Sequence, residues 1–187
     1  MKPNIGAGDS GTCQLFGKGR VDKDDCLIDA YGDLDELNSH IGHLSAFYWA
    51  NKNFGSSLKE IQNDLFVVGS HFSTCGKQPE VEAERVLWLE EGIKFMDSRL
   101  PELKTFILPS GGAEGSYCHV CRSVCRRVER KLVGMLKDRN LYCNEAGAKE
   151  SCVCLSYVNR LSDYLFSMSR YLNLLSGHRE HTWSGTW

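Results

Sequence analysis

The chain has 187 residues, of which 42% are hydrophobic and 25% charged, and its formal net charge is -2. This length suffices for one domain with its own core, and the composition is that of an ordinary globular protein. The small net charge produces no overall field that would attract nucleic acid or an anionic membrane. The sequence also contains no run of about 18 uncharged apolar residues. We therefore expect neither nucleic acid nor a membrane as a partner.

The N-terminal stretch "MKPNIGAGDSGTC" has no apolar region of the secretory type. Nine cysteines are spread along the chain, and an odd, scattered set is typical of reduced thiols rather than of a disulfide scaffold. These features predict a cytoplasmic protein, or a mitochondrial matrix protein if a presequence has been removed.

Residues 1–25 are rich in Gly and Asp, and we expect them to be irregular. Beyond them, apolar residues recur at three- and four-residue steps, and "NFGSS" at 53–57 is expected to separate the first two periodic segments. The predicted helices are 29–50, 58–72, 81–99, 114–138 and 150–176. Short connections between such helices favour an all-α, five-helix up-and-down bundle. The expected single domain comprises the segment 1–25, a bundle over 29–176 and a tail over 177–187.

The stretch "SYCHVCRSVCRRVERKL", residues 116–132, carries two kinds of chemistry. At about 100° per residue, one stripe of the expected helix holds Cys118, Cys121, Cys125, Val128 and Leu132. The neighbouring stripe holds His119, Arg122, Arg126 and Arg130, whereas Arg127 points away from both. Free cysteine behaves as a small buried hydrophobe, so core packing is favoured for the first stripe.

A zinc site is the weaker interpretation of these cysteines. Zinc requires four tetrahedral ligands, and no second CxxC or HxxxH follows at a suitable spacing. The "CVC" at 152–154 is expected to place its two thiols on opposite sides of a helix. For the arginine stripe, a polyanion site competes with a solvated surface, since the guanidinium fork matches phosphate oxygens. Glu129 lies between the two stripes and could orient the arginines.

Other polar residues are weaker candidates. In "GAGDSGT", residues 6–12, small residues allow backbone N–H groups to approach an anion, although the P-loop pattern is absent. Lys23 is a candidate phosphate partner. Asp35 and Asn38 are neighbours on one helix, where acidic residues are also favoured by the helix dipole. Asn159 and Asp163 share one face of the last helix, and a solvated surface is the alternative there.

Six stretches in order resemble the PduO-type ATP:cob(I)alamin adenosyltransferases: "GDSGT", "RVDKDD", "DAYGDLDELNSHIG", "FILPSGG", "CHVCRSVCRRVERKL" and "NRLSDYLF". The resemblance implies a ferritin-like five-helix bundle that forms a homotrimer with active sites between subunits. It implies transfer of the 5′-deoxyadenosyl group of ATP to the cobalt of cob(I)alamin, giving adenosylcobalamin and inorganic triphosphate. ATP would carry Mg²⁺ held mainly by its phosphates, so no metal ligand from the protein is expected.

The resemblance also assigns residues. Asp35 and Arg122 match a pair that bridges subunits near the corrinoid, Phe106 matches the aromatic that displaces the lower axial ligand of cobalt, and Arg126 would assist catalysis. The implied nucleotide-binding residues are Gly6, Gly8, Asp9, Gly11, Thr12, Lys23, Arg126, Arg127, Glu129, Arg130 and Asn159. A flavoprotein reductase and an adenosylcobalamin-dependent enzyme are the protein partners that such chemistry requires.

Two departures from the family pattern stand out. The family usually has Thr-Lys/Arg-Thr before "GD", whereas this chain has Ile5, Gly6 and Ala7, and so lacks a cation and two hydroxyls. This loss motivates an alternative function, that of a catalytically weak homologue serving as an adenosylcobalamin carrier or regulatory partner. The tail "HTWSGTW" adds Trp183 and Trp187, which either cover the corrin face or pack on the bundle.

Overall fold

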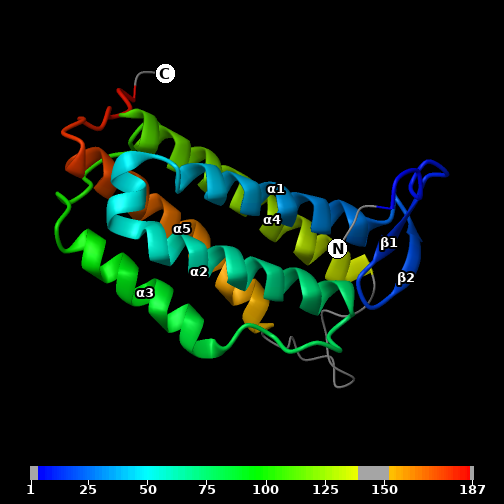
Figure 1. Cartoon of the computed structure of the whole chain (residues 1–187). Coiled ribbons are helices and arrows are strands. Elements are labelled where there is room, and N and C mark those ends of the chain that lie inside the picture. The colour runs from blue at the N-terminus through cyan, green and yellow to red at the C-terminus, as the bar shows by residue number, and fades with distance from the viewer. Residues whose placement is uncertain (1–3, 139–151, 186–187) are drawn as a thin grey trace.

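The fold is described by a computed structural model that covers residues 4–138 and 152–185. Within this part of the chain, five helices follow a short β-hairpin (Figure 1). The elements are β1 (Thr12–Leu15), β2 (Gly19–Asp22), α1 (Cys26–Leu44), α2 (Tyr48–Ser73), α3 (Ala83–Asp97), α4 (Ala113–Asp138) and α5 (Val153–Leu175). The prediction of an all-α, five-helix bundle is confirmed.

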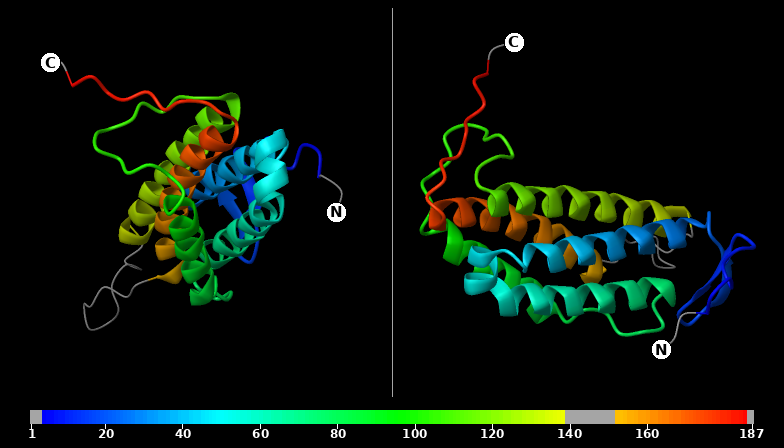
Figure 2. Two further views of the ribbon diagram at one scale, coloured as in Figure 1. Left: turned by 90° about the vertical axis from the view of Figure 1, so that its left-hand side faces the viewer. Right: turned by 45° about the horizontal axis from the view of Figure 1, so that its top comes forward.

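The helices lie along a common long axis (Figure 1). The hairpin lies at one end of the bundle, and the connection 98–112 lies at the other end together with the C-terminal segment (Figure 2). Helix α4 packs most extensively against α5 and α1, and α3 packs against α5. Fully buried Leu37, Ile41, Leu132, Leu161 and Leu165 form part of the shared core. Burying one such side chain contributes roughly 1.5–3 kcal/mol to stability.

The expected break between the first two helices is wrong. The chain turns at residues 45–47, and α2 then runs without interruption through "NFGSS". The carboxylate of Glu114, on α4, accepts hydrogen bonds from the backbone N–H groups of Trp49 (3.0 Å) and Ala50 (2.9 Å). It therefore caps the first turn of α2 from a distant part of the chain. Burial of Phe54 and Leu58 offsets the weak helix propensity of the intervening Gly and Ser residues.

The expectation of an irregular N-terminal segment is also wrong in part. Residues 12–22 form an antiparallel hairpin in which Thr12 pairs with Asp22 and Leu15 with Gly19. Leu15 is 4% exposed and anchors the hairpin to the core. Each strand has only four residues, which is too short for an alternating pattern to be recognised in the sequence.

The fourth helix begins and ends within one residue of its predicted bounds. The loop expected after the fourth helix falls on residues 139–151, which lie outside the described residues. Trp187 lies outside them as well. Among the helices of the described part, none is long and apolar enough to cross a membrane.

The Glu114 cap leads to a prediction about stability. Glu114→Gln removes the charge and turns one N–H acceptor into a donor, so the first turn of α2 loses at least one of its two caps. We expect the free energy of unfolding to fall by about 1–2 kcal/mol in urea denaturation at neutral pH. Glu84→Gln, an exposed acid in the first turn of α3, is the matched control and should change stability by less than about 0.5 kcal/mol. Equal effects of the two variants would contradict the capping role.

Candidate functional site

The cysteine stripe of α4 is part of the core, as predicted. Cys118, Cys121 and Cys125 are fully buried, and two of the thiols donate hydrogen bonds to backbone carbonyls of α5, Cys118 to Leu165 (3.2 Å) and Cys125 to Val158 (3.3 Å). Burial raises the pKa of Cys121 to about 12, and it raises the pKa of the other two thiols as well. Neutral thiols of this kind pack against α5 and are poor metal ligands.

The arginine stripe runs along the side of α4 that carries Glu129, which contacts α5 through Asn159. Arg126 and Arg130 are exposed, and Arg122 is half-buried. Among the described residues, Nε of Arg122 has no hydrogen-bond partner although it is buried. Burial, followed by the charge of Arg126, lowers the pKa of Arg122. A row of cations with an unused buried donor is well suited to an anionic ligand.

Glu129 and Asn159 link α4 and α5 beside this row. The side-chain amide of Asn159, on α5, donates a hydrogen bond of 2.8 Å to the Glu129 carboxylate on α4. Arg130 also donates to the backbone carbonyl of Arg126, one helical turn earlier (3.1 Å). The structure thus brings together five of the predicted site residues on one surface: Arg122, Arg126, Glu129, Arg130 and Asn159.

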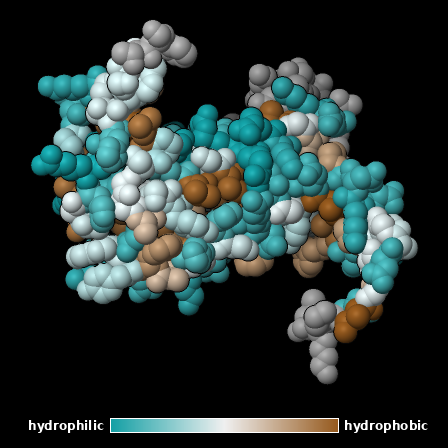
Figure 3. All heavy atoms as spheres, turned by 90° about the horizontal axis from the view of Figure 1, so that it is seen from above, coloured by the Kyte–Doolittle hydropathy of each residue, from teal (hydrophilic) through white to brown (hydrophobic). Residues whose placement is uncertain are grey.

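Arg127 lies on another side of α4. Its guanidinium forms ion pairs with Asp33 (2.9 Å) and Glu36, both on α1, while the neighbouring Lys131 pairs with Asp29 (2.5 Å). Figure 3 views the molecule from the side of α1 and α4, and hydrophilic side chains cover much of this face. In this chain Arg127 links two helices, and its predicted role in nucleotide binding is not supported by its position within the chain.

His119 shares the helical stripe of the arginines, but unlike Arg126 and Arg130 it is buried. It is 3% exposed and forms a hydrogen bond with Ser169 on α5 (Oγ to Nε2, 3.1 Å). Helical phase alone placed His119 beside Arg122, but the close approach of α5 covers it. Burial, with a further contribution from Arg122, lowers the pKa of His119 to about 4, so the ring is neutral at neutral pH.

Phe106 lies at the end of the bundle opposite the hairpin and is 78% exposed. It borders an open cavity of about 590 Å³ whose lining residues are Leu103, Lys104, Thr105, Phe106, Ile107 and Phe166. Phe166 belongs to α5, so the cavity adjoins the α4–α5 pair. The backbone N–H of Trp183 donates to the Phe106 carbonyl (2.8 Å), and the two rings are 6.4 Å apart. Trp183 therefore lies against Phe106, at the border of this cavity.

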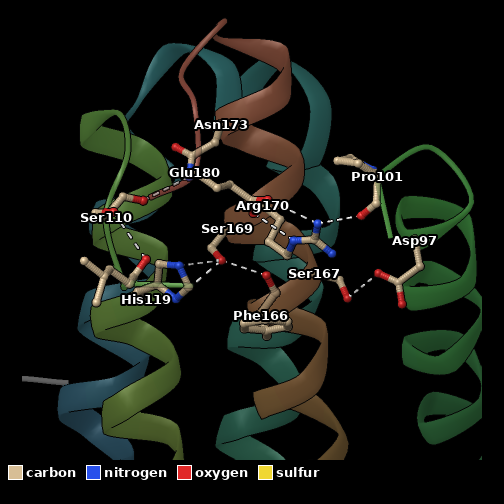
Figure 4. A network of polar contacts seen from close by, with 11 residues as sticks. Asp97, Pro101, Ser110, His119, Phe166, Ser167, Ser169, Arg170, Asn173 and Glu180 are labelled. Atoms are coloured by element: carbon tan, nitrogen blue, oxygen red, sulfur yellow. Dashed lines mark hydrogen bonds and ion pairs between the residues drawn. The ribbon is translucent and has the colours of Figure 1, made fainter. Parts of the chain in front are cut away.

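A polar network that the sequence did not reveal holds this end of the molecule together (Figure 4). Arg170, on α5, is 5% exposed and forms an ion pair with Glu180 of the tail (2.7 Å) and a hydrogen bond to the carbonyl of Pro101 (2.8 Å). The Asn173 side chain accepts from the Gly112 N–H (3.0 Å) and donates to the Ser110 carbonyl (3.0 Å). Both the tail and the connection that carries Phe106 are thus tied to α5.

The N-terminal loop is built for close approach to its backbone. Gly6 and Gly11 both have φ near +80°, a backbone conformation that residues with a Cβ atom rarely adopt. A Cβ atom at Gly8 would lie 3.1 Å from the Lys23 Nζ, so the ammonium group lies directly over the backbone there. Asp9 is exposed on the same loop. Gly6, Gly8, Asp9, Gly11, Thr12 and Lys23 therefore lie together in one loop region, and their role in nucleotide binding stays a prediction.

Arg20 is a functional candidate that the sequence analysis missed. From β2 its guanidinium donates to the Thr12 hydroxyl (3.0 Å from Nε) and to the backbone carbonyl of Ala7. A cation therefore braces the loop from the opposite strand, next to the position where Ile5, Gly6 and Ala7 lack the family's cation and hydroxyls. In the hairpin register Arg20 pairs with Gln14, so Thr12 lies two residues further along the same face of β1, but strands this short gave no signal in the sequence.

The predicted site residues form two separate groups within one chain. The first is the row of arginines on α4, with Phe106 beyond one end. The second is the N-terminal loop with Lys23. Asp35 belongs to neither, since it lines a small cavity between α1 and α2 with Asn38 and Phe66. Asn38 itself links the two helices, because its amide donates to the Gln62 carbonyl (3.1 Å).

Comparison with known proteins now identifies the family. The family model described as "Cobalamin adenosyltransferase" matches residues 4–172. The chain belongs to the cobalamin adenosyltransferase family. Among curated family members, a cobalamin adenosyltransferase of Cupriavidus metallidurans is 39% identical over 94% of this chain and 90% of its own length. The corrinoid adenosyltransferase of Bacillus subtilis is 37% identical over 95% and 89%, and the human MMAB protein is 38% identical over 92% and 69%.

Solved family structures have the same fold. A phenylalanine-to-histidine variant of a PduO-type ATP:corrinoid adenosyltransferase from Lactobacillus reuteri, complexed with cobalamin and ATP, superposes with a TM-score of 0.86 at 31% identity and covers 100% of this chain and 98% of its own. An arginine-to-lysine variant from the same organism, complexed with ATP, gives 0.84 at 30% identity and covers 97% and 99%.

Two predictions follow from the geometry of this family member, and the first concerns Arg20. Arg20→Gln removes the charge that holds Ala7 and Thr12 together, so the loop should open more often. We expect amide hydrogen exchange of residues 5–12, measured by mass spectrometry, to accelerate about tenfold while the helices are unchanged. Lys18→Gln, an exposed residue of the same hairpin, is the control and should leave exchange unaltered. Unaltered exchange in Arg20→Gln would remove Arg20 as the brace.

The second prediction concerns His119. Its folded pKa of about 4 lies below the ordinary value of 6.5, so between these values the unfolded chain binds more protons than the folded chain. Folding stability should therefore decrease as the pH falls from 6.5 to 4, by up to about 3 kcal/mol from this group. His119→Gln should remove that part of the pH dependence in urea denaturation, whereas His178→Gln, at an exposed site, should retain it. Identical pH profiles for His119→Gln and the wild type would contradict the assignment.

Proposed function

We propose that this protein transfers the 5′-deoxyadenosyl group of ATP to the cobalt of cob(I)alamin, forming adenosylcobalamin and inorganic triphosphate. The observation that carries the proposal is the row of arginines on α4 beside an apolar cavity at Phe106. One part suits a polyphosphate and the other a large, mostly apolar ring. Relatives that match nearly the whole chain are corrinoid adenosyltransferases, and neighbouring structures are complexes with cobalamin and ATP.

The arginines act on the leaving group. As the cobalt electron pair forms a bond to the 5′ carbon, the bond from that carbon to oxygen breaks and triphosphate departs with its electrons. Its negative charge must be stabilised in the transition state. Arg126 and Arg130 supply exposed cations, and the unused Nε of Arg122 supplies a further donor. Mg²⁺ would accompany the phosphates, and the chain contributes neither a nucleophile nor a general base.

Phe106 and its cavity serve the corrinoid. An apolar wall formed by Phe106, Leu103 and Phe166 excludes water and a lower axial ligand from cobalt. Cob(II)alamin without that ligand accepts an electron more easily and becomes the nucleophilic cob(I)alamin. A flavoprotein reductase is the class of partner that would supply the electron, and an adenosylcobalamin-dependent enzyme would consume the product.

A homotrimer would join the two groups of site residues. The N-terminal loop of one subunit would cover the arginine row of the next, and Asp35 would meet the neighbouring subunit's copy of Arg122. Large apolar side chains are exposed in the N-terminal segment, with Ile5 96% and Phe16 62% exposed, and beside Asp35, with Phe66 of α2 63% exposed. Such side chains are typical of a surface that is buried on assembly.

The alternative function is that of an adenosylcobalamin carrier or regulatory partner with weak catalysis. The absence of the usual Thr-Lys/Arg-Thr before Gly8 favours it, since a charge-assisted phosphate contact is worth roughly 1.5–3 kcal/mol. Arg20 argues against it, because its guanidinium lies against the same loop. The alternative predicts tight corrinoid binding with weak ATP binding, which calorimetric titration distinguishes from the main proposal.

The decisive experiment mixes the protein with ATP, Mg²⁺ and chemically reduced cobalamin. We expect the absorption spectrum of a light-sensitive alkylcobalamin to appear, and Arg126→Ala to lower kcat about a hundredfold, because one cation that stabilises the leaving group is lost. Arg99→Ala, which removes an exposed arginine of the α3 end, is the control and should retain full activity. No alkylcobalamin at saturating ATP, with the protein folded, would refute the proposal, and an unchanged rate for Arg126→Ala would exclude that residue.

A further inference from the structure

A cluster of potential metal ligands lies where the C-terminal end of α2 meets the N-terminal end of α5. The ligand atoms of His71, Cys152 and Cys154 all lie within 4.8 Å of one another. This cluster faces α2, whereas Asn159 on the same helix faces α4, so it is separate from the arginine row.

The expectation that the "CVC" thiols lie on opposite sides of a helix is wrong. Cys152 precedes α5 in an extended conformation (φ -64°, ψ 117°), which lets both thiols turn to one side.

The hydrogen bonds of His71 fix which ring nitrogen is available. Its Nδ1 lies 2.9 Å from the backbone carbonyl oxygen of Gln78. A carbonyl oxygen can only accept, so the hydrogen is on Nδ1 and the lone pair of a neutral ring is on Nε2. That Nε2 lies 3.3 Å from a carboxylate oxygen of Glu80. Two acceptors face each other there, and the pair is favourable only if a cation, either a proton or a metal ion, lies between them.

The surrounding backbone holds the other ligands in place. The second carboxylate oxygen of Glu80 accepts the N–H of Val153 (2.9 Å), which leaves the first oxygen directed at His71. The backbone N–H groups of Leu155 and Val81 donate to the sulfurs of Cys152 and Cys154. Such outer contacts orient the ligands.

We propose that His71, Cys152 and Cys154 bind a thiophilic divalent cation of the Zn²⁺ class, and that the Glu80 carboxylate, which faces His71 Nε2, completes a tetrahedral site when the ion binds. Zn–N and Zn–O bonds of about 2.1 Å at the tetrahedral angle separate nitrogen and oxygen by about 3.4 Å, which agrees with the 3.3 Å between His71 and Glu80. The ligand atoms of His71, Cys152 and Cys154, which lie within 4.8 Å of one another, must move inward on binding, and the Glu80 carboxylate must approach the sulfurs. Cys154 is buried, while His71 and Cys152 are partly exposed, so an ion can enter from one side.

The site would tie the α2–α3 connection to the start of α5. The same connection supports the N-terminal hairpin, since a Cβ atom at Gly17 would lie 2.5 Å from the Thr74 side chain. The Thr74 hydroxyl in turn accepts a hydrogen bond from the backbone N–H of Gln78 (3.1 Å), and the carbonyl of Gln78 contacts His71 of the cluster. A bound cation would therefore stabilise the scaffold beneath the loop that carries Gly8 and Lys23.

The test uses the full-length chain, reduced with a phosphine and freed of metal by a chelator. Titration with Co²⁺ should saturate at one equivalent and produce a thiolate-to-cobalt charge-transfer band with the intense visible bands of tetrahedral Co²⁺. Zn²⁺ should displace the Co²⁺ and raise the Tm of the wild type. His71→Gln and Cys152→Ser should each weaken binding at least tenfold. Cys75→Ser is the matched control, an exposed thiol near the end of α2, and should bind as the wild type does.

Circular dichroism establishes that each variant is folded before titration. The proposal is overturned if the reduced wild type gives no charge-transfer band, because then a proton shared by His71 and Glu80 balances the site. It is equally overturned if His71→Gln and Cys152→Ser bind Co²⁺ as tightly as the wild type, since other thiols must then hold the ion. Neither result bears on adenosyl transfer, which depends on the separate arginine row.

Discussion

The packing of α4 against α5 is the constraint on which the rest of the molecule depends. Cys118, Cys121 and Cys125 are small enough for the two backbones to approach closely, and two of their thiols donate to α5 carbonyls. This contact fixes the rotation of α4 about its axis. Once the cysteines face α5, Arg126 and Arg130 face solvent, whereas His119 is buried. A larger residue in the cysteine stripe would change the direction in which the arginines point.

Long-range polar contacts fix the positions of the irregular segments at the two ends of the bundle. At one end Arg170 and Asn173 tie the tail and the 98–112 connection to α5, which places Phe106 at the mouth of an apolar cavity. At the other end Arg20 braces the N-terminal loop from the neighbouring strand. In both places a cation or an amide on a regular element fixes the position of an irregular segment. Irregular backbone can then carry functional groups with the precision of the helices.

The sequence predicted the helices whose apolar residues recur over several turns, and it predicted the phase of α4 well enough to separate buried thiols from exposed arginines. It could not predict features that depend on distant residues. The start of α2 is set by Glu114, more than 60 residues away, and local propensity favoured a break at Gly55 instead. Likewise, His119 is buried by α5, and Arg127 is drawn to Asp33 and Glu36 on α1. Strands of four residues are too short to give a periodic signal.

Because the candidate site residues form two separate groups, the site is incomplete within a single chain. The arginine row offers positive charge with an unused buried donor, and the N-terminal loop offers backbone N–H groups and Lys23, yet each group lies on its own surface. An anion held by only one of them would remain largely solvated, and electrostatic stabilisation of a departing triphosphate is strongest where water is excluded. Assembly that brings one chain's loop over another chain's arginines would exclude that water. Catalysis and oligomerisation are therefore expected to depend on the same contacts.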